Sequence, residues 1–315
     1  MYREAAPNIR HMRSMLLTVF SALTLCTGCK SQPKVTANAR DMELINSIFD
    51  KVEAQGVDTK GNLLYGYFFF DKDRSKLEDL KGELVKQSYK FVELEKRDNG
   101  EFVLHVEKTE QHTRQTLQDR EQKLRKLAVS YGISSFDGFD VGNADPTKPL
   151  VSNDSFLKFM NAKKGNELFD LGIKLYELEI NDKAGIVFKE CVKQNIKPDT
   201  SAYKLGNVLI GQNEIEAGIK QLEQATKFNP NYMSAFFNLG AICYASMQFQ
   251  RSIQFYQQAD KLKPNDDRIV YGIAASQYAI KQFDKSFENC KRALQLNKEN
   301  ENAKQLLQML EGKVK

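Results

Sequence analysis

The amino-acid sequence predicts two folded parts, an α+β domain over residues 60–143 and an all-α solenoid over residues 165–300. The first prediction comes from short aromatic runs that alternate with segments of helical periodicity. The second comes from residue types that recur every 34 positions. A chain of 315 residues, 41% hydrophobic and 28% charged, is long enough for two cores, and its composition excludes a disordered or polytopic membrane protein.

Residues 1–28 have the pattern of a secretory signal peptide. Three arginines in the first 13 residues precede the uncharged stretch 15–26, which is shorter than the roughly 20 apolar residues that span a bilayer. The stretch 25–29 (Leu-Cys-Thr-Gly-Cys) resembles a bacterial lipobox, which implies cleavage before Cys29 and lipidation of its thiol. A lipid-anchored protein of the cell envelope, facing the periplasm or exterior, is therefore expected. The alternative is an ordinary secretion signal with Cys29 as a bystander.

Residues 29–59 are expected to hold a polar tether and one short helix. Apolar residues recur at helical spacing over 40–53, which predicts a helix that docks against the α+β domain.

The α+β domain is predicted from strand-forming runs and a hairpin signal. Asn99-Gly100 lies between two runs of period two, the pattern typical of a β-hairpin. The expected elements are a strand at 63–70, a helix that ends near Tyr89, strands at 91–95 and 102–107, a helix at 113–132 and a strand at 136–141. This βαββαβ order predicts an antiparallel sheet with both helices on one face, the ferredoxin-like arrangement.

The same segment resembles the bacterial regulator of ribonuclease activity B family. The resemblance rests on the aromatic strand 65–70 and on a motif near the end of the domain. That motif comprises Phe136, Asp137, Gly138, Phe139 and Asp140. The resemblance implies inhibition of ribonuclease E. Family members tend to have Tyr and Trp where both aromatic residues are Phe here, so a contact through a Tyr hydroxyl or an indole N–H is not implied.

The titratable residues of this segment do not indicate a catalytic or nucleic-acid site. Residues 58–145 contain 15 Lys and Arg against 17 Asp and Glu, a net charge of −2, whereas binding to phosphates favours a basic surface. His105 and His112 are expected to be surface or capping residues, and Asp137 and Asp140 to be turn formers. The cysteines of the repeats, Cys191, Cys243 and Cys290, lack the C-x-x-C spacing, so no metal and no cofactor is expected.

The second half repeats with a period of 34 residues. Leu-Gly pairs at 171–172, 205–206 and 239–240 keep this spacing, as do small residues such as Ala225, Ala259 and Ala293. The set resembles the tetratricopeptide repeat, whose signature has this length. The expected parts are a linker at 144–164, repeats at 165–198, 199–232, 233–266 and 267–300, and a capping helix at 301–315.

The resemblance implies a face of the repeats that binds an extended peptide or a partner helix. The predicted groove residues are Phe169, Tyr176, Tyr203, Lys204, Asn207, Phe237, Asn238, Tyr244, Arg268, Tyr271 and Tyr278. The alternative is that some of these aromatic residues only fill space between helices. The carboxylate-clamp pattern of the family is not met, because Tyr203 stands where its first Lys would lie.

Together, these observations indicate a non-enzymatic envelope lipoprotein that binds a protein or peptide through its repeats, with no direct contact to nucleic acid. The alternative is a regulator that inhibits a ribonuclease through residues 60–143. An enzyme is not indicated, since no nucleophile has a recognisable base beside it.

Overall fold

The computed structural model describes residues 37–313. The signal peptide, Cys29 and the polar tether before residue 37 lie outside the described residues. The first described element is helix α2 (Ala37–Glu53). None of the helices in the described part combines the length and the apolar character that a membrane span requires.

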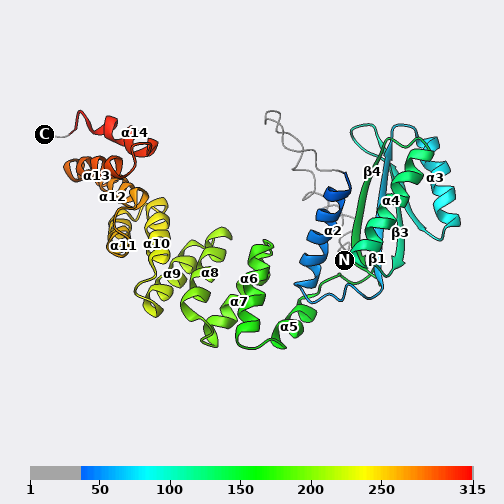
Figure 1. Ribbon diagram of the computed structural model, residues 1–315, viewed down its shortest axis with the longest axis horizontal. Coiled ribbons are helices and arrows are strands. Elements are labelled where there is room, and N and C mark those ends of the chain that lie inside the picture. Colours follow the sequence, from blue (N-terminus) through cyan, green and yellow to red (C-terminus); the bar gives the residue numbers. More distant parts are fainter. Residues whose placement is uncertain (1–36, 314–315) are drawn as a thin grey trace, which may run out of the picture. The chain divides into compact units, whose positions relative to one another are not determined.

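The α+β domain has the predicted order of elements. They are β1 (Leu63–Asp71), α3 (Arg74–Lys86), β2 (Lys90–Lys96), β3 (Phe102–Glu110), α4 (Arg114–Ser130) and β4 (Ser135–Asn143). The strands form one antiparallel sheet in the order β2-β3-β1-β4, which confirms the ferredoxin-like prediction. Helices α3 and α4 pack on the same face of this sheet (Figure 1).

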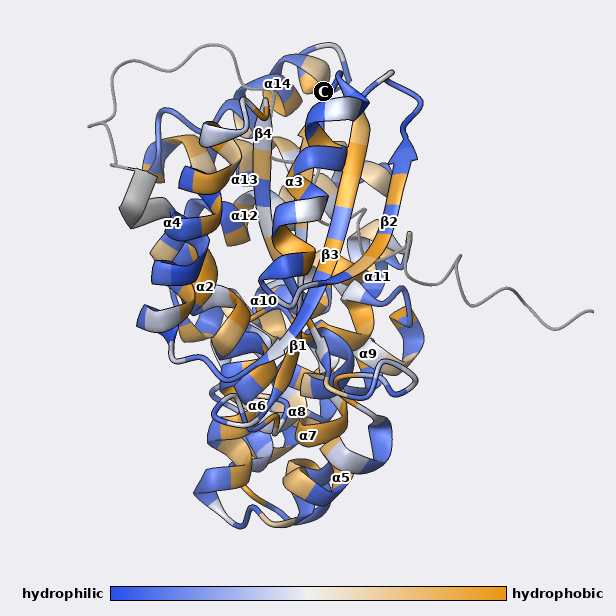
Figure 2. Cartoon of the chain, turned by 90° about the vertical axis from the view of Figure 1, so that its right-hand side faces the viewer, coloured by the Kyte–Doolittle hydropathy of each residue, from blue (hydrophilic) through white to orange (hydrophobic). Residues whose placement is uncertain are grey.

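The core of this domain follows from alternation along β1. Tyr65, Tyr67 and Phe69 are fully buried and share one cluster with Leu80 of α3 and Leu117 of α4. Because successive strand side chains point to opposite faces, these three residues all face the helices. In Figure 2 the helices carry both hydrophobic and hydrophilic residues, as expected for elements with one face in a core.

Helix ends in this domain are formed by the residue types that the sequence indicates. The Asp73 carboxylate accepts a hydrogen bond from the Ser75 backbone N–H and caps α3. Gly132 has a φ of 63°, in the left-handed region, directly after α4 ends. The predicted hairpin turn is also present, since the Gly100 N–H donates to the Arg97 carbonyl at 2.9 Å.

The second half of α2 belongs to the same core. Ile45 and Phe49 are buried in the cluster that contains β1. The guanidinium of Arg114, at the start of α4, donates to Asp50 at 2.9 Å and to Glu53 at 2.8 Å. These contacts dock this helix as the sequence predicts.

The repeats consist of paired helices joined by short turns (Figure 1). They are preceded by α5 (Asn153–Asn161), which lies within the stretch expected to be a linker, and whose Phe156 and Met160 are buried in the cluster of the first repeat. The paired helices are α6 (Asn166–Glu177) with α7 (Asn181–Lys193), α8 (Pro198–Gly211) with α9 (Ile215–Phe228), α10 (Met233–Ala245) with α11 (Phe249–Leu262) and α12 (Asp267–Ala279) with α13 (Phe283–Leu296). The capping helix is α14 (Glu301–Leu310).

Close approach within each pair depends on small residues. A Cβ at Gly206 of α8 would lie 2.8 Å from the Leu222 side chain of α9, and a Cβ at Gly240 of α10 would lie 2.7 Å from the Tyr256 ring of α11. Real Cβ atoms do not approach so closely, so these positions require glycine. The physical reason for the repeated Leu-Gly pair is therefore helix packing.

Candidate protein-binding site

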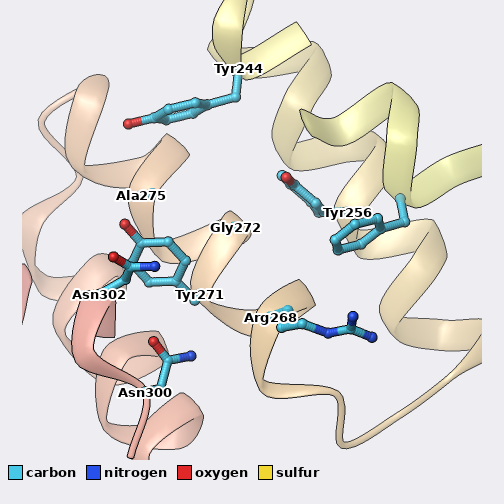
Figure 3. A pocket seen from close by; sticks show the side chains of 9 residues that line it. Tyr244, Tyr256, Arg268, Tyr271, Gly272, Ala275, Asn300 and Asn302 are labelled. Atoms are coloured by element: carbon cyan, nitrogen blue, oxygen red, sulfur yellow. The ribbon is translucent and has the colours of Figure 1, made fainter. Parts of the chain in front are cut away.

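A pocket of about 230 Å³ lies among the last two repeats and the capping helix (Figure 3). Its lining comes from α10, α11, α12 and the start of α14. The lining residues are Phe237, Tyr244, Tyr256, Arg268, Tyr271, Gly272, Ala275, Asn300 and Asn302. The pocket therefore exists only because successive repeats stack.

Tyr256 forms the inner wall, and two glycines hold its ring in place. The ring lies beside Gly240 of α10 and Gly272 of α12, where an added Cβ would come within 2.7 Å and 2.5 Å of ring atoms. The Phe237 ring meets the Tyr256 ring edge to face, with centroids 5.7 Å apart and an interplanar angle of 70°. Tyr256 is only 7% exposed, so its ring is held firmly by its neighbours.

Three tyrosine side chains border the pocket. Burial, together with the nearby Tyr244 and Tyr271, raises the pKa of Tyr256 to about 12. Burial also raises the pKa of Tyr271. Tyr244 is 41% exposed at the mouth. Within residues 37–313, none of the three hydroxyls has a hydrogen-bond partner in the protein, so each can donate to or accept from a ligand.

Arg268 contributes its stem to the pocket and directs its charge away from it (Figure 3). Its Nε and Nη2 donate to the two carboxylate oxygens of Asp266 at 3.0 Å and 2.8 Å. This hydrogen bonding holds the pKa of Asp266 well below its usual range. Arg268 alone among the nine lining residues is charged, and Asp266 balances that charge.

The two asparagines on the capping-helix side have different roles. Asn300 caps α14, since its Oδ1 accepts from the Ala303 backbone N–H at 3.0 Å, and its Nδ2 donates to Asp267 at 2.8 Å. The Asn302 amide makes no hydrogen bond to another residue of the described chain. Asn302 is therefore open to a ligand, whereas Asn300 holds the helix in place.

Four of the eleven predicted groove residues meet in this pocket: Phe237, Tyr244, Arg268 and Tyr271. Three others form a separate polar contact between the second and third repeats. There the Asn238 amide donates to the Tyr203 hydroxyl at 3.1 Å and to Asn207 Oδ1 at 2.9 Å.

The remaining predicted groove residues lie at the junction of the first two repeats and in the fourth repeat. In the first repeat, Phe169 is 6% exposed and packs near Phe188. The Tyr176 ring of the same repeat is contacted by Lys204 of the second repeat, whose Nζ lies 4.2 Å from the ring centre. In the fourth repeat, Tyr278 contacts the Phe283 ring, with centroids 5.6 Å apart. Phe169 therefore fills space between helices, which was the alternative to a role in a binding groove.

Sequence reasoning did not select five of the pocket residues as groove residues: Tyr256, Gly272, Ala275, Asn300 and Asn302. One signal was available. At the repeat position of Gly272 the earlier repeats carry Asp170, Lys204 and Asn238, so the fourth repeat alone lacks a side chain there. That missing side chain gives the Tyr256 ring its space.

The motif in the α+β domain is mainly structural. Phe136 and Phe139 are 6% and 8% exposed in the core. The expectation that Asp137 and Asp140 form a turn was wrong, because both lie in β4, where the register with β1 shifts at a bulge. Beside this irregularity, Asp140 Oδ1 accepts from the backbone N–H of its partner Gly66 at 3.0 Å. A bulge needs one extra residue in the strand, which the Asp-Gly segment supplies.

The histidines and cysteines of the described part are largely buried. His105 was expected at a surface or cap but is 8% exposed on β3, stacked on Phe68 with ring centroids 4.4 Å apart. His112 lies just before the α4 cap, hydrogen-bonded to Glu110 at 2.9 Å. Burial raises the pKa of the Cys191 thiol to about 11, which keeps it protonated and unreactive near neutral pH.

Comparisons with known proteins agree with this two-part organisation. The family model described as Regulator of ribonuclease activity B matches residues 43–141, and the TPR repeat model matches residues 206–246. A comparison with curated proteins gave no match.

Several solved structures are similar to part of this chain. One is MamA 41-end from Desulfovibrio magneticus RS-1, 17% identical, with a TM-score of 0.43 over 46% of this chain and 82% of that chain. Another is YrrB, a TPR protein with an unusual peptide-binding site, 16% identical, with a TM-score of 0.43 over 48% of this chain and 78% of that chain. A third is the Arabidopsis OM64 TPR domain, 16% identical, with a TM-score of 0.36 over 38% of this chain and 99% of that chain. The chain thus carries a regulator of ribonuclease activity B domain followed by tetratricopeptide repeats.

Proposed function

We propose that this protein is a non-enzymatic scaffold that holds a partner polypeptide against the face of the repeats that contains the pocket. The observation that carries the proposal is the meeting of four predicted groove residues around one pocket. Phe237 and Tyr244 come from α10, and Arg268 and Tyr271 come from α12, the first helix of the next repeat. Neither matched family is catalytic, which is consistent with a binding role.

The chemistry of the pocket suits recognition of a polypeptide. Aromatic residues and Arg provide much of the binding energy at protein interfaces, especially where they form a pocket that excludes water. The tyrosine hydroxyls and the Asn302 amide can pair with the backbone of an extended segment, and the ring faces can pack on its side chains.

Site-specific crosslinking in cells tests this proposal. A photoreactive phenylalanine analogue placed at Tyr244 should crosslink a polypeptide upon irradiation. The matched control is Ile186 on α7, which is 41% exposed like Tyr244 but lies on the second helix of the first repeat. If position 244 yields no more crosslinked product than position 186, the pocket face is not the binding surface.

Attachment to a membrane through Cys29 is a further part of the proposal. It is supported by the lipobox-like stretch 25–29 and the uncharged stretch before it. Cells grown with a radioactive fatty acid should label the wild-type protein and not the Cys29→Ser variant. Equal labelling of both would remove the lipoprotein assignment.

A second candidate function, inhibition of a ribonuclease, is favoured by the family match over residues 43–141. The net charge of −2 over residues 58–145 favours contact with the enzyme rather than with RNA. The full chain should then slow cleavage of a labelled RNA by ribonuclease E, and Ala275→Leu, which fills the repeat pocket, should slow it equally. Unchanged cleavage eliminates this candidate. Fatty-acid labelling also tests this candidate function. A protein that is lipidated at Cys29 is exported and does not meet a cytoplasmic ribonuclease, so labelling that depends on Cys29 would count against it.

A further inference from the structure

The aromatic lining of the pocket, its lack of an unpaired charge and its small volume together select one class of side chain. This inference rests on the proposed binding of a polypeptide. Its walls are aromatic. Phe237, Tyr244, Tyr256 and Tyr271 surround it, and Gly272 and Ala275 of α12 form a floor without large side chains. Rings arranged in this way can meet a further ring edge to face or in an offset stack, which is more favourable than contact with an aliphatic chain of equal area.

The one charged lining residue is already paired: the Arg268 guanidinium lies 5.6 Å from the centre of the Phe237 ring and is bound by the Asp266 carboxylate. Arg268 turns its guanidinium outward onto Asp266, which also accepts from Lys263 Nζ at 2.9 Å. An acidic or basic side chain that entered would lose its hydration without gaining an ion pair, and this is unfavourable for either sign of charge. The occupant is therefore uncharged.

Uncharged polar groups do face the space. The hydroxyls of Tyr244, Tyr256 and Tyr271 and the amide of Asn302 belong to the lining. Each hydroxyl can both donate and accept, so a single N–H or O–H on the occupant would find a partner in several orientations. A purely hydrocarbon side chain would leave these groups with poorer hydrogen bonding than they have in water.

The size of the pocket limits the occupant to one side chain. A space of about 230 Å³ is below the range of roughly 300 to 1,000 Å³ typical of pockets for drug-sized ligands. We infer that this pocket takes one tryptophan or tyrosine side chain, projecting from an extended segment of the partner protein. The aromatic ring would pack between the tyrosine rings, and its polar atom would meet a hydroxyl or the Asn302 amide.

Blocked tripeptides of sequence acetyl-Gly-X-Gly-amide test the inference directly. The X residue is Trp, Tyr, Phe, Leu, Glu or Lys, and binding to the full chain is measured by saturation-transfer NMR and titration. We expect Trp and Tyr to bind most tightly, Phe and Leu more weakly, and Glu and Lys not detectably. Absence of binding by the Trp and Tyr peptides, or binding by the Glu or Lys peptide as tight as theirs, would overturn the inference.

A pair of variants localises the binding to the pocket. Ala275→Leu fills the floor and should weaken binding of the Trp peptide by about tenfold. Ala241→Leu places the same change one repeat earlier, at an exposed position outside the pocket, and should leave binding unchanged. Circular dichroism must show that both variants are folded. Equal binding by both folded variants contradicts the assignment.

These outcomes can be separated from failure of the scaffold proposal. If crosslinking at Tyr244 succeeds while the tripeptides bind without preference, a partner occupies the face and only the side-chain assignment is wrong. If the Trp peptide binds in the pocket and no polypeptide crosslinks at Tyr244, the pocket chemistry is right and the scaffold proposal fails.

Discussion

The ring of Tyr256 on α11 lies against the backbone of Gly272 on α12, so closely that a Cβ at position 272 would be 2.5 Å from Tyr256 Cζ. This contact joins the third repeat to the fourth and forms the inner wall of the pocket. The stability of the repeat array and the shape of the binding site therefore depend on the same glycine.

Replacing Gly272 by alanine should destabilise the repeats. Alanine is favoured over glycine by about 1 kcal/mol inside a helix. Here the added methyl group would displace the Tyr256 ring, and overpacking of this kind costs about 1–3 kcal/mol. We expect a net decrease in the free energy of unfolding of up to about 2 kcal/mol, measured by urea denaturation. Gly211→Ala on α8 is the matched control, because no atom lies within 4 Å of its added Cβ. A Gly272→Ala variant as stable as Gly211→Ala would show that the contact is not tight.

The pairing of Asp266 with Arg268 should make stability depend on pH. Hydrogen bonds from Arg268, and then from Lys263, hold the pKa of Asp266 below its usual range, so folding favours the ionised form. A lowered pKa in the folded state means that the stabilisation is complete above the pKa of the unfolded chain and is lost as pH falls toward the folded pKa. At pH 7, Asp266→Asn should lower the free energy of unfolding by about 1–3 kcal/mol.

The difference between wild type and Asp266→Asn should shrink as pH is lowered from about 5 to about 2. Thermal denaturation at several pH values measures it. Asp170→Asn on α6 serves as the control, since Asp170 is exposed and forms no ion pair within residues 37–313. A difference that stays constant across this range would show that the Asp266 carboxylate is not the source of the stabilisation.

Much of the fold could be predicted because its signals are local. The alternation of Tyr65, Tyr67 and Phe69, the turn at Gly100 and the glycine after α4 each act within a few residues. The repeat boundaries could also be predicted, because a period of 34 residues marks the same structural position in each unit.

The burial of His105 could not be predicted, because its cause lies on a neighbouring strand. Gly66 of β1 has no side chain, and a Cβ there would lie 2.7 Å from His105 Nε2 and 2.3 Å from Asp140 Oδ1. The space that these two side chains use is therefore provided by a residue 39 positions before His105 in the chain. The contribution of Asn302 to the pocket could not be predicted either, because it also depends on a separate element. Asn302 comes from the capping helix and not from a repeat.

The hydroxyl groups of Tyr67 and Tyr89 should contribute to stability with opposite sign. The Tyr67 hydroxyl is buried without a hydrogen-bond partner among residues 37–313, whereas the Tyr89 hydroxyl accepts from Arg120 Nη1 at 2.8 Å. Tyr67→Phe should therefore be neutral or stabilise the domain by up to about 1 kcal/mol, and Tyr89→Phe should destabilise it by about 1 kcal/mol. Urea denaturation of both variants gives the comparison. An equal loss in both would indicate that the Tyr67 hydroxyl is also satisfied in solution.

The most direct measurement compares Tyr244→Ala with Tyr278→Ala in binding to the polypeptide that crosslinks at position 244. The two tyrosines occupy the same position in successive repeats and make similar ring contacts, with centroids 5.5 Å from Phe249 and 5.6 Å from Phe283, but only Tyr244 lines the pocket. Titration calorimetry should show affinity at least about tenfold weaker for Tyr244→Ala and nearly unchanged for Tyr278→Ala. Equal affinities for the two variants would contradict the claim that this pocket holds the partner.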